Sequence, residues 1–166
     1  MRDAERRTGL DWNPIIRLAH AGDADDIAAM SRELIEHGLP WTWRPARVLG
    51  AIASPETNVA VVRARDGLVG FGVMQYLDSD AYLVLLAVGR AHQRRGMGSA
   101  LLRWLEASAA AAGAQRIRLH ARRDNVAGRT FYNEHGYHEV AIQPGRYAAL
   151  LDGVGLEKWL RPRSPD

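Results

Sequence analysis

The spacing of apolar and polar residues indicates β-strands in some segments of the chain and α-helices in others. The first two segments are predicted to be a strand followed by a helix. Residues 14–20 have the composition of a short strand. Residues 22–38 carry a helical pattern, with Asp23 at the N-cap and Gly38 after the end. The apolar residues that share one face of this helix are Ile27, Met30, Leu34 and Ile35.

Two tryptophans precede a second, shorter helix, which is expected between Pro45 and Pro55. Trp41 and Trp43 have two possible roles. They are either anchors of the core, because large aromatic rings dominate core burial, or part of the wall of a substrate pocket.

The middle of the chain is rich in β-strand residues. Residues 58–65 and 68–77 are separated by Asp66-Gly67, which predicts a hairpin with a type I′ turn, because that turn needs positive φ. Residues 81–88 are apolar without a break, which is typical of a strand buried on both faces. The sequence therefore predicts three consecutive strands here.

Helices and strands alternate in the second half of the chain. The expected segments are a helix from Gly98 to Gly113, a strand at 115–121, a helix from Asp124 or Asn125 to Gly136, and strands at 137–143 and 155–160 around a loop at 144–153. The full order is therefore strand, helix, helix, three strands, helix, strand, helix and two strands.

This order combines hairpins in the first half with strand–helix–strand crossovers in the second. It predicts an α/β (α+β) fold with a mixed, mostly antiparallel sheet of about seven strands and helices on both faces. We expect a single domain over residues 1–166, with its core at 13–161 and frayed termini at 1–12 and 162–166.

Composition narrows the class of protein. Of the 166 residues, 47% are hydrophobic and 25% charged, which suits a chain with a core and argues against disorder. No apolar run approaches the ~18 residues of a membrane span, and the charged N-terminus lacks the apolar centre of a signal peptide. We therefore expect a cytoplasmic protein with no membrane partner.

The chain contains no cysteine, which excludes disulfides, thiolate metal ligands and a cysteine nucleophile. His135 and His138 lie close together, but no metal site is expected there. The net charge is +3, and arginines cluster near residues 94–95, 116–118 and 122–123. Such a patch can attract a phosphate-bearing molecule. No nucleic-acid partner is expected, because interleaved aromatic residues are missing.

A glycine turn is the clearest candidate for chemistry. Gly96 and Gly98 follow an apolar strand and open a helix, whose first N–H groups have no partner within the helix. This arrangement can hold a phosphate, and Arg94 and Arg95 add charge at its rim. A Walker loop is excluded because no Lys-Ser/Thr pair follows. A dinucleotide fingerprint is excluded because its third glycine position is Leu101.

Two sequence blocks together resemble the signatures of the GNAT superfamily of N-acetyltransferases. The first block is Leu86, Ala87, Val88 and then Gln93, Arg94, Arg95, Gly96, Met97, Gly98; the second is Asn125, Gly128, Tyr132, Gly136, Tyr137. The C-terminal half is most similar to the branch of ribosomal-protein alanine acetyltransferases and its relatives. The resemblance implies a GNAT-like sheet and acetyl-CoA as co-substrate.

The resemblance also implies where the co-substrate binds. Backbone N–H groups at 94–99 would hold the CoA pyrophosphate, and the strand end at 86–88 would pair with the pantetheine arm at a splay in the sheet. The implied cofactor-binding residues are Leu86, Ala87, Val88, Gln93, Arg94, Arg95, Gly96, Met97, Gly98, Ser99, Asn125 and Phe131.

The implied reaction is direct attack of a primary amine on the thioester in a ternary complex. Tyr132 matches the family's usual general acid, which protonates the departing thiolate. Asp80 is the first candidate for the general base. Tyr82, or a chain of waters without a dedicated base, remain alternatives.

The acceptor is not identified by the sequence. Protein N-termini, lysine, polyamines, aminoglycosides and small metabolites all remain open, although Arg146 beside Tyr147 would favour an acidic acceptor. A non-catalytic acyl-CoA-binding module is the alternative function, and a homodimer is common in the superfamily.

Overall fold

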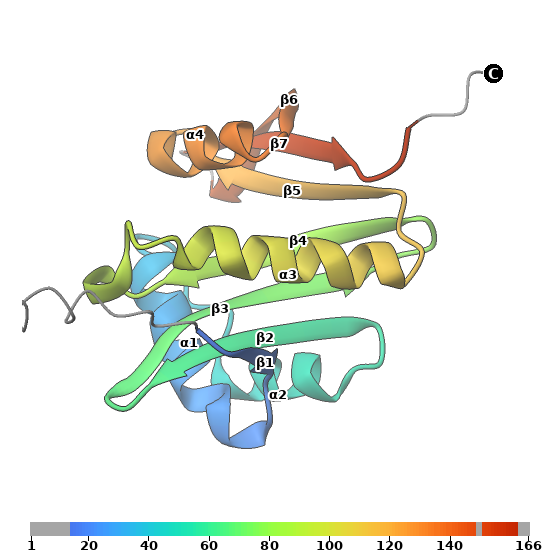
Figure 1. Ribbon diagram of the computed structural model, residues 1–166. Coiled ribbons are helices and arrows are strands. Elements are labelled where there is room, and N and C mark those ends of the chain that lie inside the picture. Colours follow the sequence, from blue (N-terminus) through green and yellow to red (C-terminus); the bar gives the residue numbers. More distant parts are fainter. Residues whose placement is uncertain (1–13, 149–150, 163–166) are drawn as a thin grey trace, which may run out of the picture.

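The protein is described here by a computed structural model that covers residues 14–148 and 151–162, with side chains described outside 141–152 (Figure 1). The strands are β1 (Ile16–Leu18), β2 (Thr57–Ala64), β3 (Gly67–Tyr76), β4 (Asp80–Val88), β5 (Arg116–Arg122), β6 (His138–Ala148) and β7 (Leu151–Trp159). The helices are α1 (Ala24–Leu34), α2 (Pro45–Ala53), α3 (Met97–Ala111) and α4 (Val126–Glu134), with short 3-10 turns η1 (Ala21–Asp23) and η2 (Arg90–His92). The predicted order of helices and strands is confirmed.

The seven strands form one sheet in the order β1-β2-β3-β4-β5-β7-β6. Only the β4–β5 pair is parallel among the described strand pairs, which confirms the mixed, mostly antiparallel sheet. The parallel pair is joined by the crossover helix α3 (Figure 1). Helices lie on both sides, as predicted. We call the side where α3 and α4 pack the α3 face, and the side where α1 and α2 pack the α1 face.

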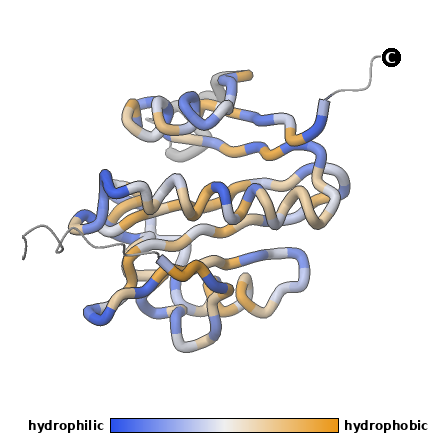
Figure 2. Tube along the Cα trace, viewed as in Figure 1, coloured by the Kyte–Doolittle hydropathy of each residue, from blue (hydrophilic) through white to orange (hydrophobic). Residues whose placement is uncertain are grey.

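The apolar side chains gather inside these layers. Figure 2 shows hydrophobic colour along the central strands and hydrophilic colour at many of the connecting turns. One buried cluster lies between the sheet and α3, around Leu101, Leu102 and Leu105, and a second lies against α1 and α2, around Ile27 and Phe71. None of the helices within 14–148 and 151–162 is both long and apolar enough to cross a membrane.

A β-bulge in β4 shifts by one residue the alternation of its side chains between the two faces of the sheet. Val73 of β3 pairs with Leu85 and Met74 pairs with Leu83, so Val84 is an extra residue between them. Ala81 and Leu83, before the bulge, bury their side chains on the α3 face, whereas Leu85, after it, buries its side chain on the α1 face. The strand alternates between buried and half-buried residues, so the prediction of full burial on both faces was wrong in detail.

Strands β4 and β5 pair only at their beginnings. The parallel register runs from Asp80 opposite Arg116 to Leu83 opposite Leu119, and the described residues form no further pair between these strands. Figure 1 shows the two strands separating toward the end where α3 begins. The main chain of β4 at 85–88 is therefore left without a strand neighbour on its β5 side.

Two predicted turns differ from the structure. The β2–β3 hairpin turns at Arg65-Asp66, and Gly67 supplies the positive φ, +135°, as the first residue of β3. The expected type I′ turn at Asp66-Gly67 was therefore wrong by one residue. The loop expected at 144–153 is shorter, because β6 continues to Ala148 and β7 begins at Leu151.

Candidate functional site

The glycine turn stands directly after the free end of β4. Gly96 is the N-cap of α3 with φ of +82°, and Arg94 also has a positive φ, +63°, which is rare for a residue with a side chain. The turn is therefore already bent into the shape that presents the first N–H groups of α3. These groups carry the positive end of the helix dipole and suit an anion.

Side chains on both sides hold this turn in place. Gln93 donates from Nε2 to the carbonyl of Val88 over 3.0 Å, which ties the turn to the end of β4. Met97 is buried in the core of the α3 face. Arg94 and Arg95 are exposed, so their charges remain available at the rim. The residues of the first predicted block thus lie together, at the end of β4 and the start of α3.

Helix α4 brings the second predicted block against the first. The ring of Phe131 lies beside Gly98, where an added Cβ would be 3.5 Å from Phe131 Cζ. His135 was considered in the sequence only as a metal ligand, but its Nε2 lies 2.9 Å from Ser99 Oγ and its Nδ1 lies 2.7 Å from the carbonyl oxygen of Phe131. If Nδ1 donates to that carbonyl, Nε2 accepts the Ser99 hydroxyl hydrogen.

Asn125 and Gly128 explain the spacing of the second block. Asn125 is the N-cap of α4, and its side-chain oxygen accepts a hydrogen bond from the Gly128 N–H at 3.0 Å. A Cβ at Gly128 would lie 2.4 Å from Asn125 Nδ2, so the cap requires a glycine there. The predicted contact of Asn125 with the pantetheine arm stays a prediction.

Tyr132 lies half-buried on the α3 face. Its ring makes edge-to-face contacts with Phe131 and Tyr137, at centroid distances of 5.2 and 5.6 Å. The N–H of Tyr137 also donates to the carbonyl of Tyr132. These contacts hold Tyr132 next to Phe131, whose own ring lies beside Gly98 of the glycine turn.

Asp80 lies at the paired end of β4, away from the turn. Arg116 donates to both of its carboxylate oxygens, over 2.7 and 3.1 Å, and also reaches Glu157 on β7 at 3.3 Å. These bonds raise the pKa of Arg116, chiefly through the hydrogen bond to Asp80, despite the opposing effect of burial. The structure therefore does not bring Asp80 together with the other predicted site residues.

Tyr82 and His120 meet where β4 and β5 begin to separate. The Tyr82 hydroxyl is hydrogen-bonded to Nδ1 of His120, and the two ring centroids are 5.5 Å apart. His120 directly follows Leu119, the last residue of β5 that pairs with β4. Sequence reasoning considered Tyr82 but missed His120, although the alternation of residues 116–122 placed it on the same face as Arg118.

The two tryptophans are half-buried against the cluster on the α1 face, as expected of core anchors. Arg32 and Arg44 lie over the ring of Trp41 at 4.9 and 4.8 Å, and Arg47 lies over Trp43 at 4.1 Å. Their faces are therefore occupied by cations from the same chain.

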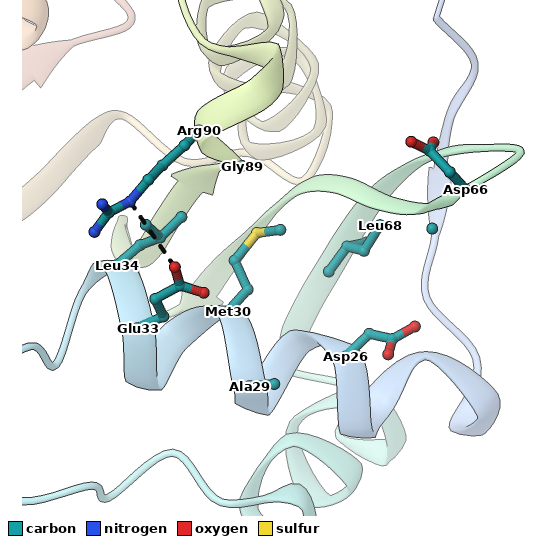
Figure 3. A pocket seen from close by; sticks show the side chains of 10 residues that line it. Asp26, Ala29, Met30, Glu33, Leu34, Asp66, Leu68, Gly89 and Arg90 are labelled. Carbon is teal, nitrogen blue, oxygen red and sulfur yellow. Dashed lines mark ion pairs between the residues drawn. The ribbon is translucent and has the colours of Figure 1, made fainter.

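A shallow hollow of about 320 Å³ opens elsewhere, between α1 and the β2–β3 turn (Figure 3). Met30, Leu34 and Leu68 form an apolar wall, and Arg90 pairs with Glu33 over 3.9 Å. None of the predicted cofactor residues lines this hollow. The side chains of Arg146 and Tyr147, predicted near the acceptor, lie outside the described residues.

Solved structures with a similar fold include acetyltransferases. Ard1 from Thermoplasma volcanium is 23% identical with a TM-score of 0.79, covering 90% of this chain and 99% of that chain. The ribosomal-protein-S18-alanine N-acetyltransferase from Escherichia coli is 21% identical with a TM-score of 0.75, covering 91% and 96%. The PaiA N-acetyltransferase from Thermoplasma acidophilum, in complex with coenzyme A, is 18% identical with a TM-score of 0.73, covering 88% and 98%.

No curated protein matches the chain in sequence. The acetyltransferase (GNAT) family, in contrast, matches residues 26–137, a span that includes most of α1, the separating strands, the glycine turn and α4. The chain therefore belongs to the GNAT family of acetyltransferases.

Proposed function

We propose that the protein is an acetyl-CoA-dependent N-acetyltransferase that transfers the acetyl group to a primary amine by direct attack in a ternary complex. One observation carries this proposal: the glycine turn opens α3 next to the end of β4 that β5 leaves unpaired. An anion site and a row of unpaired main-chain groups therefore adjoin each other. A pyrophosphate with an extended amide-bearing arm has the complementary chemistry.

Most of the predicted cofactor residues have a role in this proposal. The N–H groups at 94–99 bind the pyrophosphate, with the charges of Arg94 and Arg95 beside them. The main chain of Leu86, Ala87 and Val88 pairs with the pantetheine arm as an added strand would. Phe131 packs against it from α4. The neighbour from Thermoplasma acidophilum, which was solved with coenzyme A, supports this choice of ligand.

The acetyl transfer requires three events around the thioester carbon. The amine must lose a proton, the oxyanion must be stabilised, and the departing thiolate must be protonated. An exposed main-chain N–H of β4 can donate to the acetyl oxygen. Tyr132, held by Phe131 and Tyr137, is the proposed donor to the thiolate sulfur.

Asp80 as the general base stays a prediction. Because Arg116 engages both of its oxygens, we propose that Asp80 chiefly holds β5 beside β4. Asp80→Asn should then keep kcat within about threefold while lowering the free energy of unfolding by about 1 kcal/mol. Steady-state kinetics and urea unfolding would measure both effects. A loss of kcat in a variant of unchanged stability would restore Asp80 as the base.

The function is tested by mixing the protein with acetyl-CoA and following release of the CoA thiol. The acceptors are a peptide beginning with alanine, Nα-acetyl-lysine, spermidine and kanamycin. We expect release above hydrolysis with at least one acceptor. Tight CoA binding without turnover of any amine would instead favour the alternative, a non-catalytic acyl-CoA-binding module.

Gly96 provides a matched test of the pyrophosphate site. An alanine at its φ of +82° costs about 1–2 kcal/mol of backbone strain, so Gly96→Ala should weaken CoA binding about tenfold. Gly113→Ala is the control, because Gly113 also has a positive φ, +93°, and open space at its Cβ, but lies at the other end of α3. Isothermal titration with CoA measures both variants. Equal losses would show that left-handed geometry at Gly96 is not what the ligand needs.

A further inference from the structure

We infer that the amine acceptor is an acidic peptide or protein segment, whose carboxylates bind a cationic surface beside the place where β4 and β5 separate. This inference deepens the proposed acetyl transfer and rests on it. The surface is formed by the end of α1, the connection to α2 and the first turn of α2. We call it the arginine–tryptophan surface; its residues are Arg32, Trp41, Trp43, Arg44 and Arg47.

The arginines of this surface are stacked on the two indole rings. The guanidinium groups of Arg32 and Arg44 lie over Trp41, and that of Arg47 lies over Trp43. A guanidinium that stacks through its flat face keeps its N–H groups at the edge, where they can bind a carboxylate with two hydrogen bonds. The arginines are exposed and the tryptophans half-buried, so the charges are presented to solvent on a fixed base.

Glu36 holds the connection in this shape from the inside. Its buried carboxylate accepts hydrogen bonds from the N–H groups of Thr42 and Trp43 and from the hydroxyls of Ser31 and Thr42, over 2.6 to 3.2 Å. The Thr42 hydroxyl in turn accepts from Arg47 over 3.2 Å. The inner carboxylate and the outer cation are therefore linked through a neutral hydroxyl, and the Arg47 charge remains at the surface.

The three arginines form no ion pair with a carboxylate among the described side chains, which are those of residues 14–140 and 153–162. Glu33 follows Arg32 in the chain but pairs with Arg90 over 3.9 Å. The first turn of α2 contains no acidic residue, and the positive end of the helix dipole lies there. The surface therefore has three positive charges that an acidic partner would balance.

The arginine–tryptophan surface adjoins the separating strands. Arg122, the last residue of β5, donates from Nη1 to the main-chain carbonyl of His37, in the connection between α1 and α2, over 2.6 Å. Pairing between β4 and β5 stops at Leu83 opposite Leu119, so Arg122 belongs to the separated end of β5. Arg118 adds an exposed cation to the same side of the sheet, because its neighbours in β5 are buried on the α3 face. The rest of an acceptor held at this opening would therefore meet cations.

The charge of the surface distinguishes between classes of acceptor. Polyamines and aminoglycosides are cationic and would be repelled by it. Single-stranded nucleic acid binds chiefly where its bases can stack on aromatic rings, but Trp41 and Trp43 already stack on arginines. An extended acidic peptide needs no ring face, and its carboxylates match the guanidinium groups one by one. The observations therefore favour the peptide.

The test uses three peptides of equal length that begin with alanine and continue with aspartate, glutamine or arginine residues. Transfer joins the peptide nitrogen to the acetyl carbon and breaks the carbon–sulfur bond, and the proton lost by the amine is balanced by the proton gained by the CoA thiolate. Release of the thiol therefore reports on each peptide. We expect kcat/KM for the aspartate peptide to exceed that for the glutamine peptide about tenfold and that for the arginine peptide about 10²-fold.

Salt should weaken this preference. The Debye length falls from about 10 Å at 0.1 M salt to about 3 Å at 1 M, so exposed charges no longer attract each other at a distance. We expect kcat/KM for the aspartate peptide to fall with salt and that for the glutamine peptide to stay nearly constant. If the panel above identifies lysine as the acetylated amine, the same three tails flank one lysine in a peptide with a blocked N-terminus.

Charge reversal supplies a readout that a merely structural role would not change. Arg44→Glu and Arg47→Glu should each lower kcat/KM for the aspartate peptide about fivefold and raise it for the arginine peptide, with kcat and CoA affinity unchanged. A distorted surface would instead lower all three values together. Arg44→Lys keeps the charge and should keep the preference. Arg103→Glu is the matched control, because Arg103 is an exposed arginine of α3, on the other side of the sheet.

Equal kcat/KM for the three peptides, or best turnover of spermidine or kanamycin, overturns the inference and leaves the proposed function standing. An equal effect of Arg103→Glu also overturns it. A single-stranded RNA oligonucleotide that displaces the aspartate peptide from wild type, but no longer binds Arg44→Glu, would assign the surface to nucleic acid. A protein that binds CoA but acetylates no amine contradicts the proposed function, and the inference falls with it.

Discussion

Replacement of Tyr132 by phenylalanine is expected to lower kcat by about 10²- to 10³-fold and to leave CoA affinity within about twofold. The ring, which contacts Phe131 and Tyr137, would stay in place, and only the hydroxyl would be lost. Without this donor, the thiolate would leave unprotonated. Steady-state kinetics at saturating acetyl-CoA, with CoA titration alongside, measures the two effects separately.

Tyr137→Phe is the matched control for this experiment. The Tyr137 hydroxyl donates to Glu106 at 3.3 Å, and Lys158 holds the same carboxylate at 2.8 Å. Burial, followed by the nearby charge of Glu106, raises the pKa of Tyr137, so this tyrosine stays neutral. Its loss should cost about 1 kcal/mol of stability with little change in kcat. Unchanged kcat in Tyr132→Phe would instead assign sulfur protonation to another group.

The largest expected effect on stability comes from Asp23→Ala. Asp23 is 1% exposed and accepts hydrogen bonds from Arg17, Arg63 and the main chain of His20. It therefore joins β1, β2 and the start of α1. Removing it leaves two arginines without their shared partner. We expect a loss of about 2–3 kcal/mol in urea unfolding, below the 3–5 kcal/mol of fully buried pairs because both arginines keep some solvent.

The pH dependence of this effect has a definite sign. Burial alone would raise the pKa of Asp23, but the hydrogen bonds from Arg17, His20 and Arg63 outweigh it and hold the pKa well below its ordinary value. The stabilisation is therefore complete above the unfolded pKa, near 3.9, and is lost as pH falls below it. The difference between wild type and Asp23→Ala should shrink at acid pH.

Asp26→Ala is the control for Asp23. Its carboxylate also receives a hydrogen bond from Arg63, over 2.7 Å, but the side chain is 55% exposed. We expect a change of less than about 1 kcal/mol. A similar loss in both variants would mean that burial of Asp23 adds nothing to its ion pairs.

The sequence predicted well what depends on neighbours along the chain. Asn125 caps α4 through Gly128, three residues later, and Gly96 opens α3, so both sites follow from local geometry. Contacts between side chains on different strands leave no such local pattern in the sequence. Tyr82 and His120 lie 38 residues apart, and only the β4–β5 register brings them together.

The same lack of a local signal applies to the polar partners of Asp80 and Asp23. Asp80 was chosen through the family resemblance, which concerns a single strand, whereas its partner, Arg116, comes from another strand, 36 residues away. Asp23 occupies the predicted N-cap, yet its carboxylate bonds to arginines of β1 and β2 rather than capping α1. Hydrophobic periodicity predicts the face of an element and says little about the polar groups that meet across elements.

The bulge at Val84 also determines where the chain tolerates changes of length. An extra or missing residue in the turn before β4, near Ser79, alters only a loop, because the register restarts at Asp80. A single deletion between Leu83 and Val88 would instead rotate the residues of the cofactor edge to the other side of the sheet. Natural and engineered length variants should therefore accumulate in the β3–β4 turn and be rejected within the strand.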